Sequence, residues 1–104
     1  MRTIGHFIDG VETTGKSENF ADVHNPATGE VQARVALATQ ADLQAAVEAA
    51  AQAQPRWAAT NPQRRAHVFF NYVGLLNQHM DELAELLSAE HGKTFEDAKG
   101  DIQR

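Results

Sequence analysis

The sequence predicts an α+β chain in which two β-hairpins come first and four helices follow. Residues 5–36 contain short β-prone runs separated by turn residues, whereas the chain after Thr39 has the apolar spacing of helices. Glycine, proline, asparagine and threonine stand where those helices should begin or end. A length of 104 residues allows one small domain.

The first predicted hairpin is "HFIDGVET", in which Asp9-Gly10 joins two short runs. This dipeptide suits a type I′ turn, because both central residues of that turn need a positive φ. The second hairpin contains the turn sequence "NPATG" at 25–29. In the strand that follows, Val31, Ala33 and Val35 alternate with polar residues, and this period of two predicts a half-buried strand.

The first helix is predicted to begin at 39–42, where "TQAD" resembles a capping box with Asp42 in the acidic position. Its apolar stripe is mostly alanine, so neighbouring elements could approach it closely. Pro55 lacks an amide proton and should end or offset this helix, which would leave Trp57 in a connecting turn. The stripe consists of Leu43, Ala46, Val47, Ala50 and Ala53.

The second helix is predicted to begin near Asn61-Pro62, because proline is tolerated at the first helical position. Between 61 and 79 it is apolar over much more than one face, so it needs partners on more than one side. A chain this short buries only a modest fraction of its surface, and we expect part of the core to be missing. The apolar residues are Val68, Phe69, Phe70, Tyr72, Val73, Leu75 and Leu76.

A third helix, which contains three leucines, should stop at Gly92 in a left-handed cap. Thr94 predicts a new helix start, with Asp97 in the capping-box position. Apolar residues lie along one face of this fourth helix, and the sequence ends inside the helix at Arg104. We expect such an ending in a fragment rather than in a finished domain.

Composition excludes several classes of function. The net charge is −5 with both signs interspersed, and Arg64-Arg65 is the only basic cluster, so a nucleic-acid surface is not expected. No segment approaches the roughly 18 apolar residues of a membrane helix, and the start lacks the apolar run of a signal peptide. A soluble cytoplasmic protein is expected. Because cysteine is absent, the chain itself holds no disulfide and no thiolate nucleophile.

Individual candidate motifs carry little chemistry by themselves. "HGKT" ends like a phosphate-binding loop, but the glycine required five positions before Gly92 is Leu87, and a helix precedes it where a strand is needed. The five histidines include no i, i+4 pair, so no metal site is predicted. Arg104 is either a solvated arginine or a guanidinium that holds a carboxylate or phosphate, and residue chemistry alone favours the solvated role.

Read in order, five segments resemble the amino-terminal region of the aldehyde dehydrogenase superfamily. They are "HFIDG", "NPATGEV" leading into "ARVALAT", "DLQAAVEAAAQAQPRW", "RRA" and "DELAELLSAEHGK". The last stretch, "GKTFEDAKGDIQR", resembles the methylmalonate-semialdehyde dehydrogenases, the CoA-acylating branch of the superfamily, where Gly-Lys-Thr runs into Asp-Ala-x-Gly-Asp-(Ile or Val)-x-Arg. The resemblance implies that residues 1–104 are the N-terminal portion of the NAD-binding domain of an α/β enzyme, with the rest of that domain and the catalytic domain absent.

The implied chemistry belongs to the longer enzyme. A cysteine thiolate would attack methylmalonate or malonate semialdehyde, and hydride would pass to NAD. After loss of carbon dioxide, coenzyme A would take the remaining acyl group as propionyl-CoA or acetyl-CoA. The resemblance also implies a homodimer or homotetramer. It supplies no catalytic residue, NAD contact or metal ligand in this chain, which is expected to be inactive alone.

One residue gains a role from the resemblance. Arg104 matches the arginine of the "GDIQR" stretch, which in this branch is thought to receive the substrate carboxylate. The resemblance therefore reverses the preference for a solvated arginine. Two alternatives remain open, another NAD(P)-dependent aldehyde dehydrogenase and a self-sufficient helical module that binds a partner protein.

Overall fold

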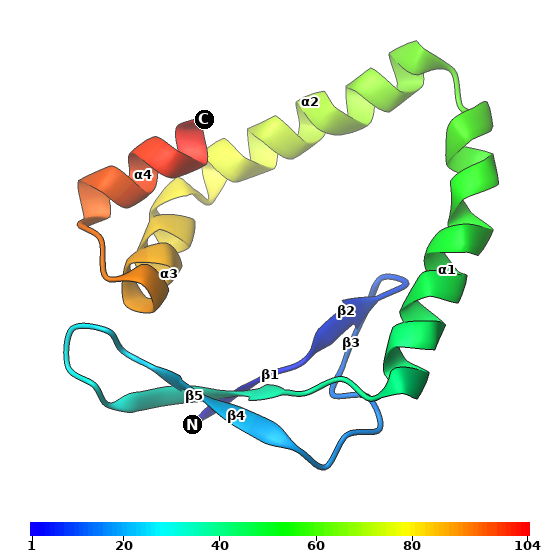
Figure 1. The fold of residues 1–104 in the computed structure, drawn as a ribbon. Helices are drawn as coiled ribbons and strands as arrows, with labels where there is room; N and C mark the ends of the chain where they lie inside the picture. Colours follow the sequence, from blue (N-terminus) through cyan, green and yellow to red (C-terminus); the bar gives the residue numbers. More distant parts are fainter. The chain divides into compact units, whose positions relative to one another are not determined.

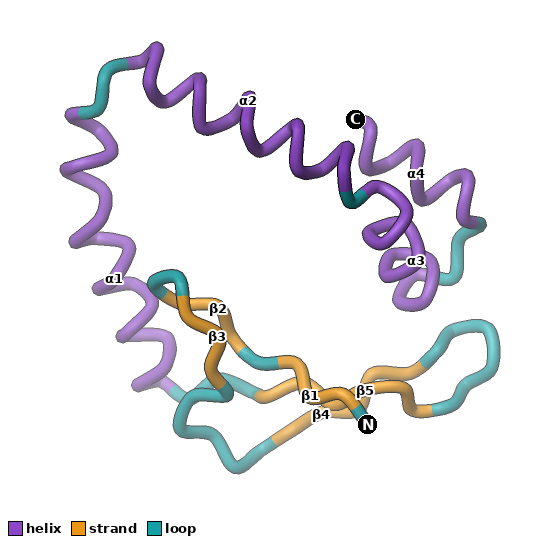
Figure 2. Tube along the Cα trace, turned by 180° about the vertical axis from the view of Figure 1, so that it is seen from behind, coloured by secondary structure: helices purple, strands orange, loops and turns teal.

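Five short strands open the chain and form two separate sheets (Figure 1). The structure is a computed structural model that describes all of residues 1–104. In one sheet β2 pairs with β3, and in the other the strand order is β1-β5-β4. Figure 2 shows the strands in orange. The strands are β1 (Arg2–Ile4), β2 (His6–Ile8), β3 (Val11–Thr13), β4 (Phe20–His24) and β5 (Val31–Ala36).

Both predicted hairpins are confirmed. β2 and β3 are antiparallel and meet at Asp9-Gly10, whose φ angles of 53° and 75° are the positive values that the turn requires. β4 and β5 are also antiparallel. In the loop between them the Asn25 side chain accepts a hydrogen bond from the Ala27 amide at 2.9 Å, and Gly29 has a φ of 78°.

The two-hairpin prediction missed β1, which pairs with β5 in parallel and places Ile4 opposite Val35. The predicted inward face of β5 holds at Ala33, which is buried, and at Val35, which is half-buried, but Val31 is 37% exposed. The exception at Val31 coincides with a shift in register: Val23 pairs with Ala33, but His24 pairs with Val31. A bulge of this kind changes which side chains face the core without any signal in the apolar pattern.

Four helices follow the strands: α1 (Gln40–Ala59), α2 (Pro62–Gln78), α3 (Met80–His91) and α4 (Phe95–Gln103). The expected break at Pro55 is wrong, because α1 continues through it and Trp57 is helical. Proline removes only one backbone hydrogen bond there, and the helix-forming residues Ala58 and Ala59 still follow. The connecting turn lies instead between Ala59 and Pro62.

Three helix boundaries follow the predicted chemistry. The Asn61 side chain accepts a hydrogen bond from the Gln63 amide at 2.8 Å, and Pro62 is the first residue of α2. Gly92 ends α3 in the left-handed conformation, with a φ of 88°. At the start of α4 the Thr94 hydroxyl accepts from the Asp97 amide at 3.2 Å.

The start of α1 is held by a carboxylate that is bonded on two sides. The Asp42 side chain accepts from the Thr39 amide at 2.9 Å, and the Thr39 hydroxyl accepts from the Asp42 amide at 3.2 Å, so the capping box is confirmed. Asp42 also accepts from the Lys16 amide at 3.0 Å, which ties the loop after β3 to the helix. The hydrogen bond from Thr39 lowers the pKa of Asp42, although burial opposes it.

The chain divides into two compact units, residues 1–24 with 31–59 and residues 25–30 with 60–104. Neither unit contains a fully buried large side chain. The buried apolar residues of the first unit are Ala33 and Ala36, and those of the second are Ala84 and Ala98, on helices α3 and α4 that pack together. Alanines alone supply little apolar burial, so this core is small.

Helix α2 contains no buried residue. Six of its large apolar side chains are more than half exposed, and Phe70 is 70% exposed. The exposed apolar surface expected of an incomplete core is therefore present on this helix. Besides Phe70, the exposed apolar side chains of α2 are Val68, Phe69, Tyr72, Val73 and Leu75.

None of the four helices combines the length and the apolar character needed to cross a bilayer.

Candidate functional site

The candidate site lies at the junction of α3 and α4, where the sequence placed Arg104. Gly92 stops the first helix, Thr94 starts the second, and Lys93 stands between them. This short connection returns the chain so that α4 packs on α3. The turn therefore brings Lys93 close to the last turn of α4, eight residues further along the chain.

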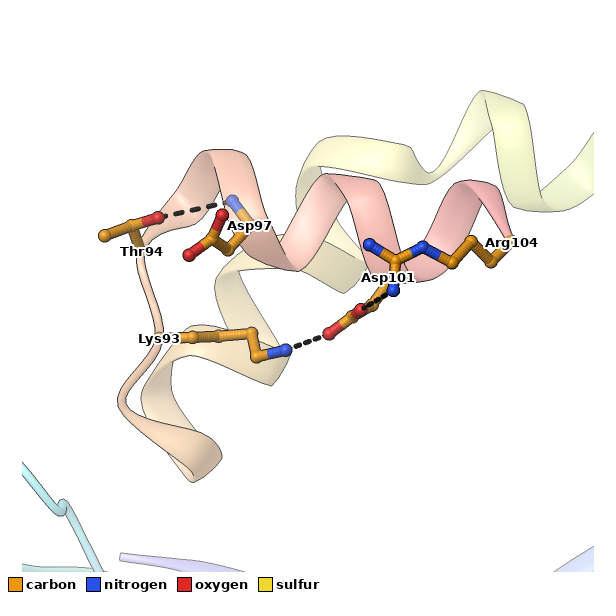
Figure 3. Close-up of polar contacts among 5 residues, drawn as sticks. All are labelled: Lys93, Thr94, Asp97, Asp101 and Arg104. Carbon is orange, nitrogen blue, oxygen red and sulfur yellow. Dashed lines mark hydrogen bonds and ion pairs between the residues drawn. The ribbon is translucent and has the colours of Figure 1, made fainter.

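Three charged side chains meet there and form a cluster, Lys93–Asp101–Arg104 (Figure 3). The Lys93 ammonium pairs with one carboxylate oxygen of Asp101. The Arg104 guanidinium approaches the other oxygen, with Nη1 and Oδ1 3.3 Å apart. One carboxylate thus bridges two cations, and the cluster keeps a net positive charge.

The carboxylate at the centre of the cluster is ionised at neutral pH. The hydrogen bond from Lys93 is the largest influence and lowers the pKa of Asp101, burial opposes it, and the charges of Lys93, Arg104 and His91 lower it further. The two ion pairs therefore persist throughout the neutral range. Neighbouring cations also explain an acidic residue near the C-terminal end of α4, where the helix dipole disfavours negative charge.

Arg104 is the most accessible member of the cluster. Its side chain is 81% exposed, compared with 22% for Lys93 and 34% for Asp101. A guanidinium has five N–H donors, and Asp101 engages only one of its nitrogens. The remaining donors can receive a second carboxylate, which an arginine binds best with two parallel hydrogen bonds.

The sequence analysis named Arg104 but missed Lys93 and Asp101. The spacing of Asp101 and Arg104 is i, i+3, which places the two side chains on one helix face and could have suggested their pairing. The pair between Lys93 and Asp101 crosses a turn, and no periodic pattern indicates it. Figure 3 shows Lys93 reaching from that turn to Asp101 on the helix.

The other candidate motifs form no site. The residues of "GKT" end one helix and cap the next, as their turn chemistry predicted. His79 pairs locally with Glu82 at 3.0 Å, at the junction of α2 and α3. No three histidine, aspartate or glutamate side chains are grouped so that they could hold a metal ion.

Comparison with known proteins identifies the family. Residues 13–104 match the sequence profile of the aldehyde dehydrogenase family. The chain belongs to this family. The match includes α3, α4 and the cluster, so the resemblance inferred from the ordered segments is confirmed.

Individual aldehyde dehydrogenases match over nearly the whole chain. The mitochondrial acylating methylmalonate-semialdehyde/malonate-semialdehyde dehydrogenase of Mus musculus is 43% identical over 102 residues, which are 98% of this chain and 19% of that protein. A provisionally assigned methylmalonate-semialdehyde dehydrogenase from Sinorhizobium meliloti 1021, solved with NAD, is 64% identical with a TM-score of 0.97. The methylmalonate-semialdehyde dehydrogenase of Oceanimonas doudoroffii is 42% identical with a TM-score of 0.94.

These relatives are much longer than the chain. It is covered completely by the Sinorhizobium structure and to 99% by the Oceanimonas structure, but it spans only 21% of each. The matched part is the amino-terminal part of the relatives. The predicted fold class is thus confirmed: the strands and four helices correspond to about a fifth of an aldehyde dehydrogenase fold.

Proposed function

We propose that this chain is the amino-terminal part of an NAD-dependent, CoA-acylating methylmalonate-semialdehyde or malonate-semialdehyde dehydrogenase. The observation that carries the proposal is similarity along nearly the whole chain to proteins named methylmalonate-semialdehyde dehydrogenases. One of them, solved with NAD, is 64% identical, and another, named as acylating, is 43% identical. The expected products are propionyl-CoA or acetyl-CoA together with carbon dioxide. Residues 1–104 would form the N-terminal portion of the NAD-binding domain, and the rest of the enzyme would lie in segments outside this sequence.

The start of α4 does not fit the pyrophosphate of a dinucleotide. The start of α4 is capped by the Thr94 hydroxyl and carries Glu96 and Asp97, which would repel a pyrophosphate. Lys93, the cation nearest to it in sequence, is paired with Asp101. We therefore assign NAD and coenzyme A to segments outside this chain. The chain contains no cysteine and is expected to be inactive alone.

This chain would contribute Arg104 to the substrate site. The exposed guanidinium has free donors and stands in a cluster of net positive charge. The two proposed semialdehydes each carry a carboxylate, which distinguishes them from simple aldehydes such as propanal. Pairing of that carboxylate with Arg104 would select the anionic substrates and orient their aldehyde end.

Two other functions compete with this one. Another NAD(P)-dependent aldehyde dehydrogenase would share the fold and would not need Arg104 for its substrate. A self-sufficient module would use the exposed apolar surface of α2 to dock a partner helix. A homodimeric or homotetrameric enzyme remains a prediction that follows from the family resemblance, and a cytoplasmic location remains a prediction from the sequence pattern.

Reading the encoding DNA beyond the codon for Arg104 tests the proposal. The expected result is an open frame that brings a glycine-rich strand–helix segment and, further on, a cysteine, because the reaction needs a dinucleotide site and a thiolate. A stop codon directly after Arg104, with an intact upstream start, would instead favour the self-sufficient binding module.

A further inference from the structure

We propose that Asp101 is a positioning residue for Arg104, and that Lys93 neutralises Asp101 so that the charge of Arg104 stays available to an anionic substrate. This inference rests on the proposed function, because it concerns how the substrate carboxylate is received. It adds two residues to the specificity-determining part of the site and assigns each a separate task.

The positioning role follows from geometry. The Arg104 side chain is 81% exposed within residues 1–104, so packing inside this part of the fold does not fix its rotamer. The single polar contact that holds the guanidinium is the one from Nη1 to the Asp101 carboxylate at 3.3 Å. Asp101 is itself held by Lys93 and is only 34% exposed, so it offers a more fixed anchor. A guanidinium held at one edge loses less freedom when its other donors bind a carboxylate.

The role of Lys93 follows from charge. If Asp101 and Arg104 stood alone, they would form a neutral pair that gives little attraction to an anionic substrate. Lys93 supplies a second cation on the far oxygen of Asp101. It lies on the turn before α4 and is 22% exposed, so it is less accessible to a substrate than Arg104. The cluster therefore presents its net positive charge mainly at Arg104.

A double-mutant cycle tests the positioning role in a complete enzyme. A chimaera is made in which this chain replaces the matching fifth of the Sinorhizobium meliloti protein. KM and kcat are measured with malonate semialdehyde and with propanal for the parent chimaera, Asp101→Asn, Arg104→Leu and the double variant. If Asp101 positions Arg104, Asp101→Asn should raise KM for the semialdehyde about two- to fivefold, the range typical of an exposed ion pair, with little change in kcat or in the propanal constants. A purely electrostatic effect of removing the negative charge would lower that KM, so a fall would overturn the positioning role.

The decisive comparison is the effect of Asp101→Asn when Arg104 is already leucine. A positioning residue acts through its target, so the increase in KM should disappear in the Arg104→Leu background. A purely structural role of Asp101 would persist in that background and would affect both aldehydes, and this result would overturn the inference. If Arg104→Leu itself alters both aldehydes equally, the proposed function fails. If Arg104→Leu is selective but Asp101→Asn has no effect, only the inference fails.

Two further variants sharpen the test. Lys93→Met should raise KM for the semialdehyde but not for propanal, and a fall in that KM would contradict the neutralising role. Asp97→Asn removes another carboxylate of α4 that is outside the cluster, and it should leave the ratio of the two KM values unchanged. If Asp101→Asn does not fold, Asp101→Glu, which keeps the charge but moves it, completes the same cycle.

Discussion

Replacement of Arg104 by leucine in the chimaera is expected to raise KM for malonate semialdehyde by about ten- to a hundredfold. A charge-assisted hydrogen bond contributes roughly 1.5–3 kcal/mol, and each 1.4 kcal/mol corresponds to about a factor of ten. The guanidinium is exposed, with only one nitrogen engaged, so its loss removes the contact to the substrate without opening a cavity. Propanal lacks the carboxylate, and its KM should change by less than about twofold.

Arg104→Lys is the matched control for charge. Lysine keeps the positive charge but cannot form two parallel hydrogen bonds with a carboxylate, so it should recover only part of the loss. Steady-state rates of NADH formation with each aldehyde give all of these constants. Equal increases of KM for malonate semialdehyde and propanal in Arg104→Leu would refute the carboxylate role and would favour a different aldehyde as substrate.

The second large effect concerns helix α2. We expect the isolated 104-residue chain to bind an apolar dye strongly and to give a weak near-UV circular dichroism signal. The reason is that α2 buries none of its residues, and the core of the described chain consists of alanines. In the chimaera the remaining segments should cover this helix, so the dye binding should be lost.

Matched substitutions on α2 test whether the remaining segments of the enzyme bury this helix. Leu75 is 54% exposed in this chain, and a change to aspartate at such a position is nearly neutral in a self-sufficient domain. In the chimaera Leu75→Asp should prevent soluble expression or lower the melting temperature strongly, because the charge would be buried without a partner. Asn71→Asp, which adds the same carboxylate at an exposed polar position, is the control. A harmless Leu75→Asp, together with a cooperative isolated monomer, would support the binding-module alternative.

The sequence predicted those features that local chemistry controls. Asp9-Gly10 needs only its own φ preferences to form the turn between β2 and β3. Gly92 and Thr94 end one helix and begin the next through their own backbone and hydroxyl groups. Arg104 was found differently, since only the family resemblance gave it a role.

The features that were missed depend on contacts between residues distant in sequence, or on the ability of a helix to accept a proline near its end. β1 pairs with β5 about thirty residues away, and no local pattern records that pairing. Pro55 was read as a helix break, but the loss of one hydrogen bond near the end of α1 was tolerated. The pair between Lys93 and Asp101 forms because a turn folds α4 back onto α3. The spacing of apolar residues in the sequence does not predict such an ion pair.

The most direct test of the central claim is product analysis of the enzyme encoded by the complete reading frame that contains this sequence. The enzyme is given malonate or methylmalonate semialdehyde and NAD, with and without coenzyme A, and the acyl products are identified by mass spectrometry. We predict acetyl-CoA or propionyl-CoA, with turnover that depends on coenzyme A. Release of a free acid at the same rate without coenzyme A, or preference for an aldehyde that lacks a carboxylate, would contradict the account.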